Sequence, residues 1–287
     1  MNYFKLKQDF IAELFQNYEA REAEQIFFLV LEDVFSISRI DYALKKQEVV
    51  SDEIIQVVKN ILHELKTNKP IQHILGYGYC YERRFKVTKN VLVPRQETEE
   101  LINLILQNHR NEDLTVLDIG TGTGCIPISL KLENPSFKML ALDISEHALT
   151  VAKENAETLG VDICFLQIDI LKEKNWNGYQ DLSLDIIVSN PPYVRYSEKA
   201  QMHKNVLGYD PELALFVDDT DPLVYYRVII LFASEKLKYG GVLYFEINEA
   251  FGEEVVLLLS DNNFSNISVV NDLQGKDRIV YAKKKPK

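Results

Sequence analysis

The hydrophobic positions of this chain follow two different periods. Up to about residue 75 they recur at helical spacing, as in Phe10, Leu14 and Phe15. The clearest helix of this part is expected to begin after Ser51, whose hydroxyl suits an N-cap, and to stop before Pro70. From residue 114 onward, short apolar runs alternate with helical segments instead. The first pattern predicts a helical domain, and the second predicts a sheet flanked by helices.

The second pattern also predicts the direction of the strands. Strands are expected at 114–119, 138–143, 162–167, 184–189 and 242–247, with helices such as 145–159 and 222–238 between them. This alternation indicates a parallel sheet covered on both faces, whereas the last runs, 265–270 and 278–283, predict an antiparallel edge pair. Glycine, aromatic and β-branched residues favour a hairpin before the sheet. We therefore expect a helical domain at 1–75, a β-hairpin linker at 76–93 and an α/β domain at 94–287.

The composition is that of an ordinary folded protein and narrows the classes of function. Hydrophobic residues make up 46% of the 287 residues, so a sizeable core can form. The 32 basic and 43 acidic side chains give a net charge of −11, which argues against a protein that follows a nucleic-acid backbone. The chain begins without the apolar segment of a secretory signal, and no apolar run reaches the roughly 20 residues that span a bilayer. We therefore expect a cytoplasmic protein without a membrane partner.

Cysteine and histidine positions give no sign of a metal site. Cys80, Cys125 and Cys164 lie far apart and form no C-x-x-C motif. The histidines, among them His203, show no metal-ligand spacing. We expect no metal and no disulfide framework.

A glycine-rich segment follows the first expected strand of the sheet. Residues 120–124 read Gly-Thr-Gly-Thr-Gly, directly after Asp118 and Ile119. Glycine lets the backbone approach a ligand closely at the carboxyl end of a strand, where such sheets bind ligands. The spacing fits neither the G-x-G-x-x-G dinucleotide fingerprint nor a phosphate-binding loop, which needs Gly-Lys-Ser/Thr. It is similar instead to the S-adenosylmethionine (SAM) loop of Rossmann-like methyltransferases.

Two acidic positions follow later strands. Asp143 ends the second expected strand of the sheet, about where an acid reaches ribose hydroxyls in this architecture. Its alternative role is to help cap the helix that follows. Asp169 and Ile170 come after the third strand and are expected to border an adenine ring, although an ordinary turn explains Asp169 equally well.

The fourth expected strand ends in a tetrad formed by Asn190, Pro191, Pro192 and Tyr193. Successive prolines remove N–H donors and fix φ, and a residue before proline is held extended. The Asn190 side-chain oxygen and the Pro191 carbonyl can therefore form a rigid pair of acceptors beside the flat ring of Tyr193. This arrangement fits a planar NH2 group, with its hydrogens on the two oxygens and its plane on the ring. A proline-rich turn without a ligand is the alternative.

Such a pair of acceptors makes a weakly nucleophilic nitrogen more reactive. The nitrogen of an amide or an aniline-like amine is a poor nucleophile because its lone pair is delocalised. Acceptors aimed at its hydrogens move electron density toward the nitrogen, and alignment with a sulfonium methyl group supplies proximity. The site need not supply a charged base, so we assign no acid–base residue.

The tetrad is shared by DNA amino-methyltransferases and by the HemK/PrmC family, and further segments resemble the second. That family methylates the glutamine side chain of peptide chain release factors. Segments that resemble its patterns are 70–76 (PIQHILG), 91–99 (VLVPRQETE), 209–215 (YDPELAL) and 240–247 (GGVLYFEI). The similarity extends over essentially the whole chain, including a small helical N-terminal domain.

The resemblance implies a Rossmann-like SAM-dependent methyltransferase fold, with a mostly parallel seven-stranded sheet and SAM as the cofactor. The cofactor site it implies is lined by Gly120, Thr121, Gly122, Thr123, Gly124, Asp143, Ile170 and Asn190. The substrate is implied to be the glutamine of the Gly-Gly-Gln loop of a class 1 release factor, bound by Asn190, Pro191, Pro192 and Tyr193, with Asn190, Pro191 and Tyr193 acting in catalysis. The helical domain would hold the release factor elsewhere. We expect a monomer without direct contact to nucleic acid.

The chain departs from the family pattern at a few positions. Gln96 stands where the family usually has proline. Asn248 and Phe251 replace a glycine and a glutamine after the fifth strand. Ile170 occupies a position where an aromatic ring can pack on adenine. These departures bear on fine contacts and leave the tetrad and the glycine loop intact.

Two other functions are compatible with parts of the sequence. With the same tetrad, the acceptor can be an adenine or cytosine amino group in nucleic acid. Such an enzyme must flip its base and neutralise phosphates, and the net charge of −11 argues against it. A SAM-binding scaffold without catalysis is the other alternative, but a scaffold has no need for paired carbonyl groups beside a methyl donor.

Overall fold

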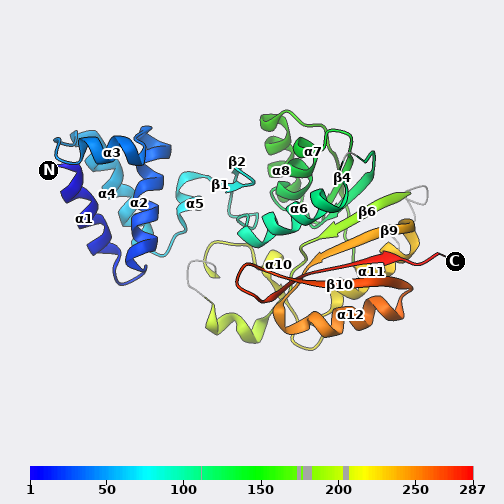
Figure 1. The fold of residues 1–287 in the computed structure, drawn as a ribbon. Coiled ribbons are helices and arrows are strands. Elements are labelled where there is room, and N and C mark those ends of the chain that lie inside the picture. Colours follow the sequence, from blue (N-terminus) through cyan, green and yellow to red (C-terminus); the bar gives the residue numbers. More distant parts are fainter. Residues whose placement is uncertain (111, 173–175, 177–182, 203–206, 287) are drawn as a thin grey trace. The chain divides into compact units, whose positions relative to one another are not determined.

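The computed structural model describes residues 1–110, 112–172, 176, 183–202 and 207–286. They form two compact units, drawn in Figure 1. The first holds Met1–Leu75 together with residues 207–209, and the second holds Gly76–Met202 and Asp210–Lys287. No described helix combines the length and the apolar character that crossing a membrane requires.

The first unit is a small bundle of helices. Its helices are α1 (Tyr3–Leu14), α2 (Ala20–Phe35), α3 (Arg39–Lys45), α4 (Asp52–Lys66) and α5 (Ile71–Leu75). As predicted, α4 begins after Ser51, whose hydroxyl accepts a hydrogen bond from the Ile54 N–H. The core contains Phe10 and Leu14, which are buried as the helical spacing predicts. Phe15, the C-cap residue that follows α1, is 75% exposed.

The segment at 76–93 contains the predicted hairpin. β1 (Tyr77–Cys80) and β2 (Arg83–Lys86) pair antiparallel around Tyr81 and Glu82, which have φ values of 50° and 62°. Cys80 and Phe85 of the hairpin are fully buried in the core of the second unit. The hairpin therefore packs as part of the second unit.

The second unit is built on a sheet of seven strands within the described part of the chain. Its further elements are α6 (Gln96–Asn108), β3 (Thr115–Ile119), α7 (Cys125–Glu133), β4 (Lys138–Asp143), α8 (Glu146–Leu159), β5 (Cys164–Gln167), β6 (Leu184–Ser189), β7 (Val194–Arg195), η2 (Tyr196–Gln201), α10 (Glu212–Leu215), β8 (Phe216–Val217), α11 (Val224–Lys236), β9 (Leu237–Glu246), η3 (Glu249–Phe251), α12 (Gly252–Asp261), β10 (Phe264–Asn271) and β11 (Asp277–Lys284). The strand order is β10-β11-β9-β6-β3-β4-β5. The strands from β9 to β5 run parallel, and β10 and β11 form the predicted antiparallel edge.

Side chains alternate across the strands, so each strand contributes to two cores. Leu117 and Ile187 lie in the core with residues of α11 and α12. Val116 and Ile186 lie in the core with residues of α6, α7 and α8. All four side chains are fully buried. Burial on both faces explains why the central strands read as nearly continuous apolar runs in the sequence.

Parallel pairing brings the carboxyl ends of neighbouring strands to one edge of the sheet. Ile119 of β3 pairs with Leu142 of β4 and with Ser189 of β6, and Ser189 pairs with Phe245 of β9. The chain runs outward from β3 through β4 to β5 and then returns to β6, on the other side of β3. This reversal creates the crevice in which open α/β sheets bind ligands.

Leu117→Ala tests the core on the α11 and α12 face. The variant should lower the free energy of unfolding by about 2–5 kcal/mol, because it leaves a cavity where a fully buried side chain stood. Leu257→Ala in α12 is a matched control, since Leu257 is 62% exposed, and its change should stay within about 0.5 kcal/mol. Urea denaturation measures both, and equal losses would contradict this core.

Candidate active site

A cavity of about 360 Å³ lies at the carboxyl edge of the sheet in the second unit. Its volume is within the range of about 300–1,000 Å³ that is usual for sites holding small molecules. Its lining comes from residues before α6, from the segments around the ends of β3, β4, β5 and β6, and from the α10 and α11 regions. The lining residues are Asn90, Val91, Leu92, Ile119, Gly120, Gly122, Leu142, Asp143, Ile144, Ser145, Ala148, Ile168, Asp169, Ile170, Leu171, Ser189, Asn190, Pro191, Pro192, Pro211, Leu213, Ala214, Tyr225 and Ile229.

The glycine loop closes onto the end of β4. The N–H groups of Gly120 and Thr121 donate to the Leu142 carbonyl at 2.9 and 3.0 Å. Gly120 and Gly122 have φ values of 79° and 55°, in the left-handed region that favours glycine. A Cβ added to either glycine would meet no atom of the described residues within 4 Å. The bare backbone therefore leaves room for a ligand to approach it closely.

The Asp143 carboxylate joins the glycine loop to the start of α8. Its Oδ2 accepts from the Gly122 N–H at 3.0 Å, and its Oδ1 accepts from the Ser145 N–H at 2.9 Å. Ser145 is the N-cap of α8. Burial raises the pKa of Asp143 above its ordinary value, and the backbone N–H groups oppose this shift. Asp143 thus supports the helix start and also lines the cavity; its contact with ribose hydroxyls stays a prediction.

Asp118 of β3 is a second carboxylate, and it immediately precedes Ile119 and the loop. Its side chain is fully buried, and neither carboxylate oxygen has a hydrogen-bond partner among the described residues. Burial, with a smaller contribution from the Asp143 charge, raises the pKa of Asp118 to about 7. When ionised, this carboxylate favours a positively charged ligand group at the neighbouring loop.

The tetrad leaves the sheet directly after β6. The Ser189 hydroxyl donates to the Ile119 carbonyl at 2.7 Å, which ties the end of β6 to the end of β3. Asn190, Pro191 and Pro192 then line the cavity. The Asn190 Nδ2 donates to Thr98 Oγ1 at 3.3 Å. The carboxamide oxygen of Asn190 therefore points away from Thr98.

Tyr193 is held at both its side chain and its backbone. Its hydroxyl donates to Glu246 Oε1 at 3.1 Å, and its carbonyl accepts from Asn248 Nδ2 at 3.3 Å. The ring packs against the core that contains residues of α11. Burial and the neighbouring Glu246 charge raise the pKa of Tyr193 well above its ordinary value, so the phenol keeps its proton and donates.

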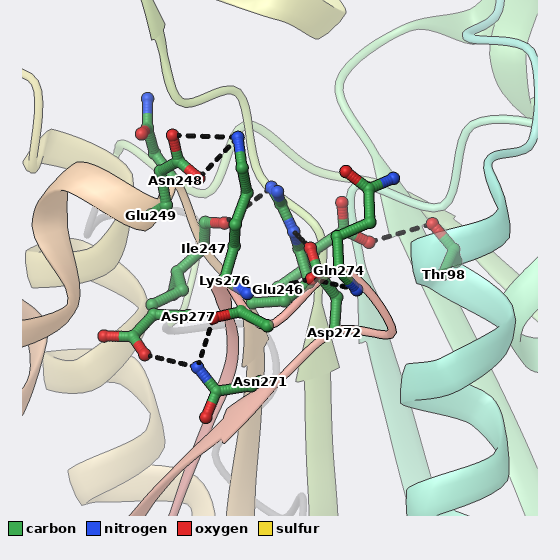
Figure 2. A network of polar contacts seen from close by, with 12 residues as sticks. Thr98, Glu246, Ile247, Asn248, Glu249, Asn271, Asp272, Gln274, Lys276 and Asp277 are labelled. Atoms are coloured by element: carbon green, nitrogen blue, oxygen red, sulfur yellow. Dashed lines mark hydrogen bonds and ion pairs between the residues drawn. The ribbon is translucent and has the colours of Figure 1, made fainter.

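Glu246, the last residue of β9, accepts hydrogen bonds from two hydroxyl groups. Besides Tyr193, the Thr98 hydroxyl donates to Glu246 Oε2 at 2.9 Å, a contact that Figure 2 shows. The Glu246 side chain is buried, and burial raises its pKa to about 7, while both hydroxyl donors favour the charged form. Glu246 therefore connects the tetrad to the first turn of α6.

Most of the site residues predicted from the sequence lie at the cavity. Its lining includes Gly120, Gly122, Asp143, Ile170, Asn190, Pro191 and Pro192. Thr121, Thr123 and Gly124 are not among the described lining residues. Both threonines are buried, and a Cβ at Gly124 would lie 3.0 Å from Ile128 Cδ1 and 3.2 Å from Ala152 Cβ, so this glycine permits close helix packing.

Tyr193 is also absent from the described lining, and hydrogen bonds through Glu246 and Thr98 link it to Asn190. In the described part of the chain, no group of His, Cys, Asp and Glu side chains is able to hold a metal ion. His203 lies outside the described residues.

Sequence reasoning missed the parts of the site that long-range folding supplies. Asn90 and Leu92 line the cavity from before α6, and Pro211 and Leu213 line it from the α10 region. Thr98 and Glu246 meet although 148 positions separate them in the chain. Most of these residues stand in segments that resemble the HemK/PrmC family, and that resemblance was their signal in the sequence.

The structure shows the surroundings of the four residues that depart from the family pattern. Asn248 donates to the Tyr193 carbonyl and accepts from the Ala250 N–H, which starts η3. Phe251 is buried beneath the Arg195 guanidinium, whose carbon lies 5.6 Å from the ring centroid. Ile170 is buried and lines the cavity. Gln96 begins α6 and is exposed.

Comparisons with known proteins identify relatives of this chain. Residues 8–76 match the family model of the PrmC N-terminal domain, and residues 96–208 match the methyltransferase small domain. A release factor glutamine methyltransferase from Flavobacterium psychrophilum is 41% identical over 278 residues, 96% of each chain. One from Bacteroides thetaiotaomicron is 42% identical over 266 residues, 92% of this chain and 94% of that one.

A solved structure supports the fold. A methyltransferase from Pyrococcus furiosus superposes with a TM-score of 0.53 at 16% sequence identity. The match covers 79% of this chain and 100% of that chain. The second unit thus has the predicted Rossmann-like methyltransferase fold.

Asp118→Asn tests the buried carboxylate through the dependence of stability on pH. The pKa of Asp118 is raised from 3.8 to about 7, so over this interval the folded protein keeps a proton that the unfolded chain has lost. The free-energy cost of burying the Asp118 charge is therefore absent below pH 3.8 and fully present above about pH 7. The stability of the variant relative to the wild type should rise with pH up to about 7 and then level off.

The measurement is urea unfolding of both ligand-free proteins at several pH values between about 5.5 and 8.5. Any offset caused by the new amide is the same at every pH and cancels from the trend. A stability difference that stays constant across this range would contradict the raised pKa.

Proposed function

Because the chain belongs to the release factor glutamine methyltransferase family, we propose that it methylates the side-chain amide nitrogen, N5, of a release factor glutamine with SAM as the methyl donor. The acceptor is the glutamine of the Gly-Gly-Gln motif in class 1 peptide chain release factors, and the modification supports translation termination. The observation that carries the proposal is the Asn190 carboxamide at the cavity, whose nitrogen end is held by Thr98.

The described residues fit SAM, which when bound supplies a methyl group on a positively charged sulfur. Gly120 and Gly122 offer bare backbone beside the cavity. Asp143 presents a carboxylate to the ribose hydroxyls, and Ile170 presents an apolar surface to the adenine. The buried Asp118 carboxylate favours a cationic group over the loop.

Asn190 and Pro191 hold the acceptor amide. The Asn190 Oδ1 and the Pro191 carbonyl accept its two hydrogens, and Tyr193, bound to Glu246, supports the tetrad from outside the described cavity lining. Pro191 precedes another proline, so its backbone is restricted to an extended conformation and its carbonyl direction is fixed. These acceptors raise the electron density on the nitrogen, and the amide loses a proton to solvent after the transfer.

The first unit is proposed to bind the release factor. It has its own hydrophobic core and matches the PrmC N-terminal domain family. We assign it the recognition of a release factor surface away from the Gly-Gly-Gln loop. The enzyme is proposed to work as a monomer in the cytoplasm without contacting nucleic acid, which agrees with its net charge of −11.

The proposal is tested by incubating the protein with methyl-labelled SAM and purified class 1 release factors. Mass mapping should find one added methyl group, on the glutamine of the Gly-Gly-Gln motif. A release factor with alanine in place of this glutamine is the control and should take up no label. Transfer of label to duplex DNA and not to any release factor would overturn the proposal.

Asn190→Ala should lower kcat about 100-fold, because it removes one of the two acceptors for the amide hydrogens. The affinity for SAM should change far less, since the glycine loop and Asp143 are untouched. Initial rates at saturating substrate and calorimetric titration with SAM measure the two effects. A variant with unchanged kcat would refute the role of Asn190.

A further inference from the structure

A chain of hydrogen bonds leads from the Asn190 carboxamide to a buried carboxylate outside the cavity lining. Asn190 Nδ2 donates to Thr98 Oγ1 at 3.3 Å, and Thr98 Oγ1 donates to Glu246 Oε2 at 2.9 Å. Thr98 is 3% exposed and Glu246 is 2% exposed, so water does not compete for these contacts. Figure 2 shows Thr98 on its helix reaching toward the carboxylate at the end of β9.

The order of donors and acceptors in this chain is fixed when Glu246 is ionised, the form that exists above its raised pKa of about 7 and that both hydroxyl donors favour. A carboxylate has no hydrogen to donate, and a threonine hydroxyl has one. The Thr98 hydrogen is used on Glu246, so toward Asn190 the Thr98 oxygen can act only as an acceptor. The NH2 end of the Asn190 carboxamide must then face Thr98, and its oxygen must face the other way.

The same carboxylate holds the other end of the tetrad. Tyr193 donates its phenol hydrogen to Glu246 Oε1 at 3.1 Å. The Glu246 backbone is fixed in turn, because its carbonyl accepts from the Tyr226 hydroxyl at 3.2 Å. Each oxygen of Glu246 thus orients one member of the tetrad, Asn190 through Thr98 and Tyr193 directly.

We infer that Glu246 and Thr98 are positioning residues that set the polarity of the acceptor site: they determine that Asn190 presents an oxygen, and not an NH2 group, to the substrate amide. This inference rests on the proposed function, because the acceptor is taken to be a carboxamide. With the opposite orientation, Asn190 would present donors to the donors of the glutamine. The acceptor nitrogen would then be repelled and misaligned.

Glu246→Gln replaces the purely accepting carboxylate by an amide with one accepting and one donating end, with little change in shape. In the orientation in which its oxygen accepts from Tyr193, the new amide donates to Thr98 with its nitrogen. The Thr98 hydrogen is then released toward Asn190 and favours a flipped carboxamide. Thr98→Val instead removes the hydroxyl at nearly constant volume, whereas Thr98→Ser keeps it.

We expect Glu246→Gln and Thr98→Val to lower kcat for release factor methylation about ten-fold or more. The KM for the release factor and the Kd for SAM should stay within about three-fold, because the rest of the cavity is unchanged. Thr98→Ser should keep most of kcat. Glu249→Gln is a matched control on the same side of the sheet end, since the Glu249–Lys276 ion pair is exposed, and its kcat should equal that of the wild type.

A second readout does not depend on turnover. In protein labelled with 15N at asparagine, the side-chain NH2 signal of Asn190 is assigned by its loss in Asn190→Ala. Its hydrogen exchange should be slow in the wild type and in Thr98→Ser, and faster in Thr98→Val. Unfolding curves establish that each variant is folded.

Unchanged kcat in folded Thr98→Val would overturn the inference, as would equal exchange of the Asn190 amide in all variants. A parallel loss of kcat and SAM affinity would also overturn it, because that result indicates general damage to the site. If the wild type methylates no release factor, the proposed function fails, and the exchange measurement still decides the inference.

Discussion

Parallel pairing of β4, β3, β6 and β9 is the constraint on which the rest of the structure depends. It places the carboxyl ends of these strands side by side, with Ile119 between Leu142 and Ser189. The glycine loop and the tetrad follow β3 and β6, and Asp143 and Glu246 are the last residues of β4 and β9, so the pairing brings all four to one edge. The burial of both sheet faces makes this register costly to shift, because a slip of one residue would exchange the two cores.

In the proposed mechanism the tetrad acts through neutral groups, and the carboxylate that orients two of them, Glu246, lies outside the described cavity lining. Backbone restriction fixes Pro191, while Asn190 has a side chain whose two ends differ only in hydrogen-bonding character. A rotamer preference cannot distinguish the oxygen from the nitrogen of such a carboxamide. The buried carboxylate of Glu246 makes the distinction through the Thr98 hydroxyl. Glu246 thus directs Asn190 without itself being among the described residues that line the cavity.

Sequence reasoning succeeded where the signal was local. The glycine spacing at 120–124, the acid at the end of β4 and the two prolines after β6 each identify their structure from a few neighbouring residues. It failed where the partner lies far along the chain, as with Thr98 and Glu246, which meet across 148 positions. The positions of strands and helices were thus predictable from the sequence. The hydrogen bonds that hold the tetrad from distant parts of the chain were not.

The most direct measurement is a crystal structure of the protein with S-adenosylhomocysteine and a Gly-Gly-Gln peptide. The account predicts that the glutamine nitrogen lies about 3 Å from both Asn190 Oδ1 and the Pro191 carbonyl oxygen, and that it faces the sulfur of the spent cofactor. The contradicting result is a glutamine held elsewhere, with residues 190–193 turned away from that sulfur.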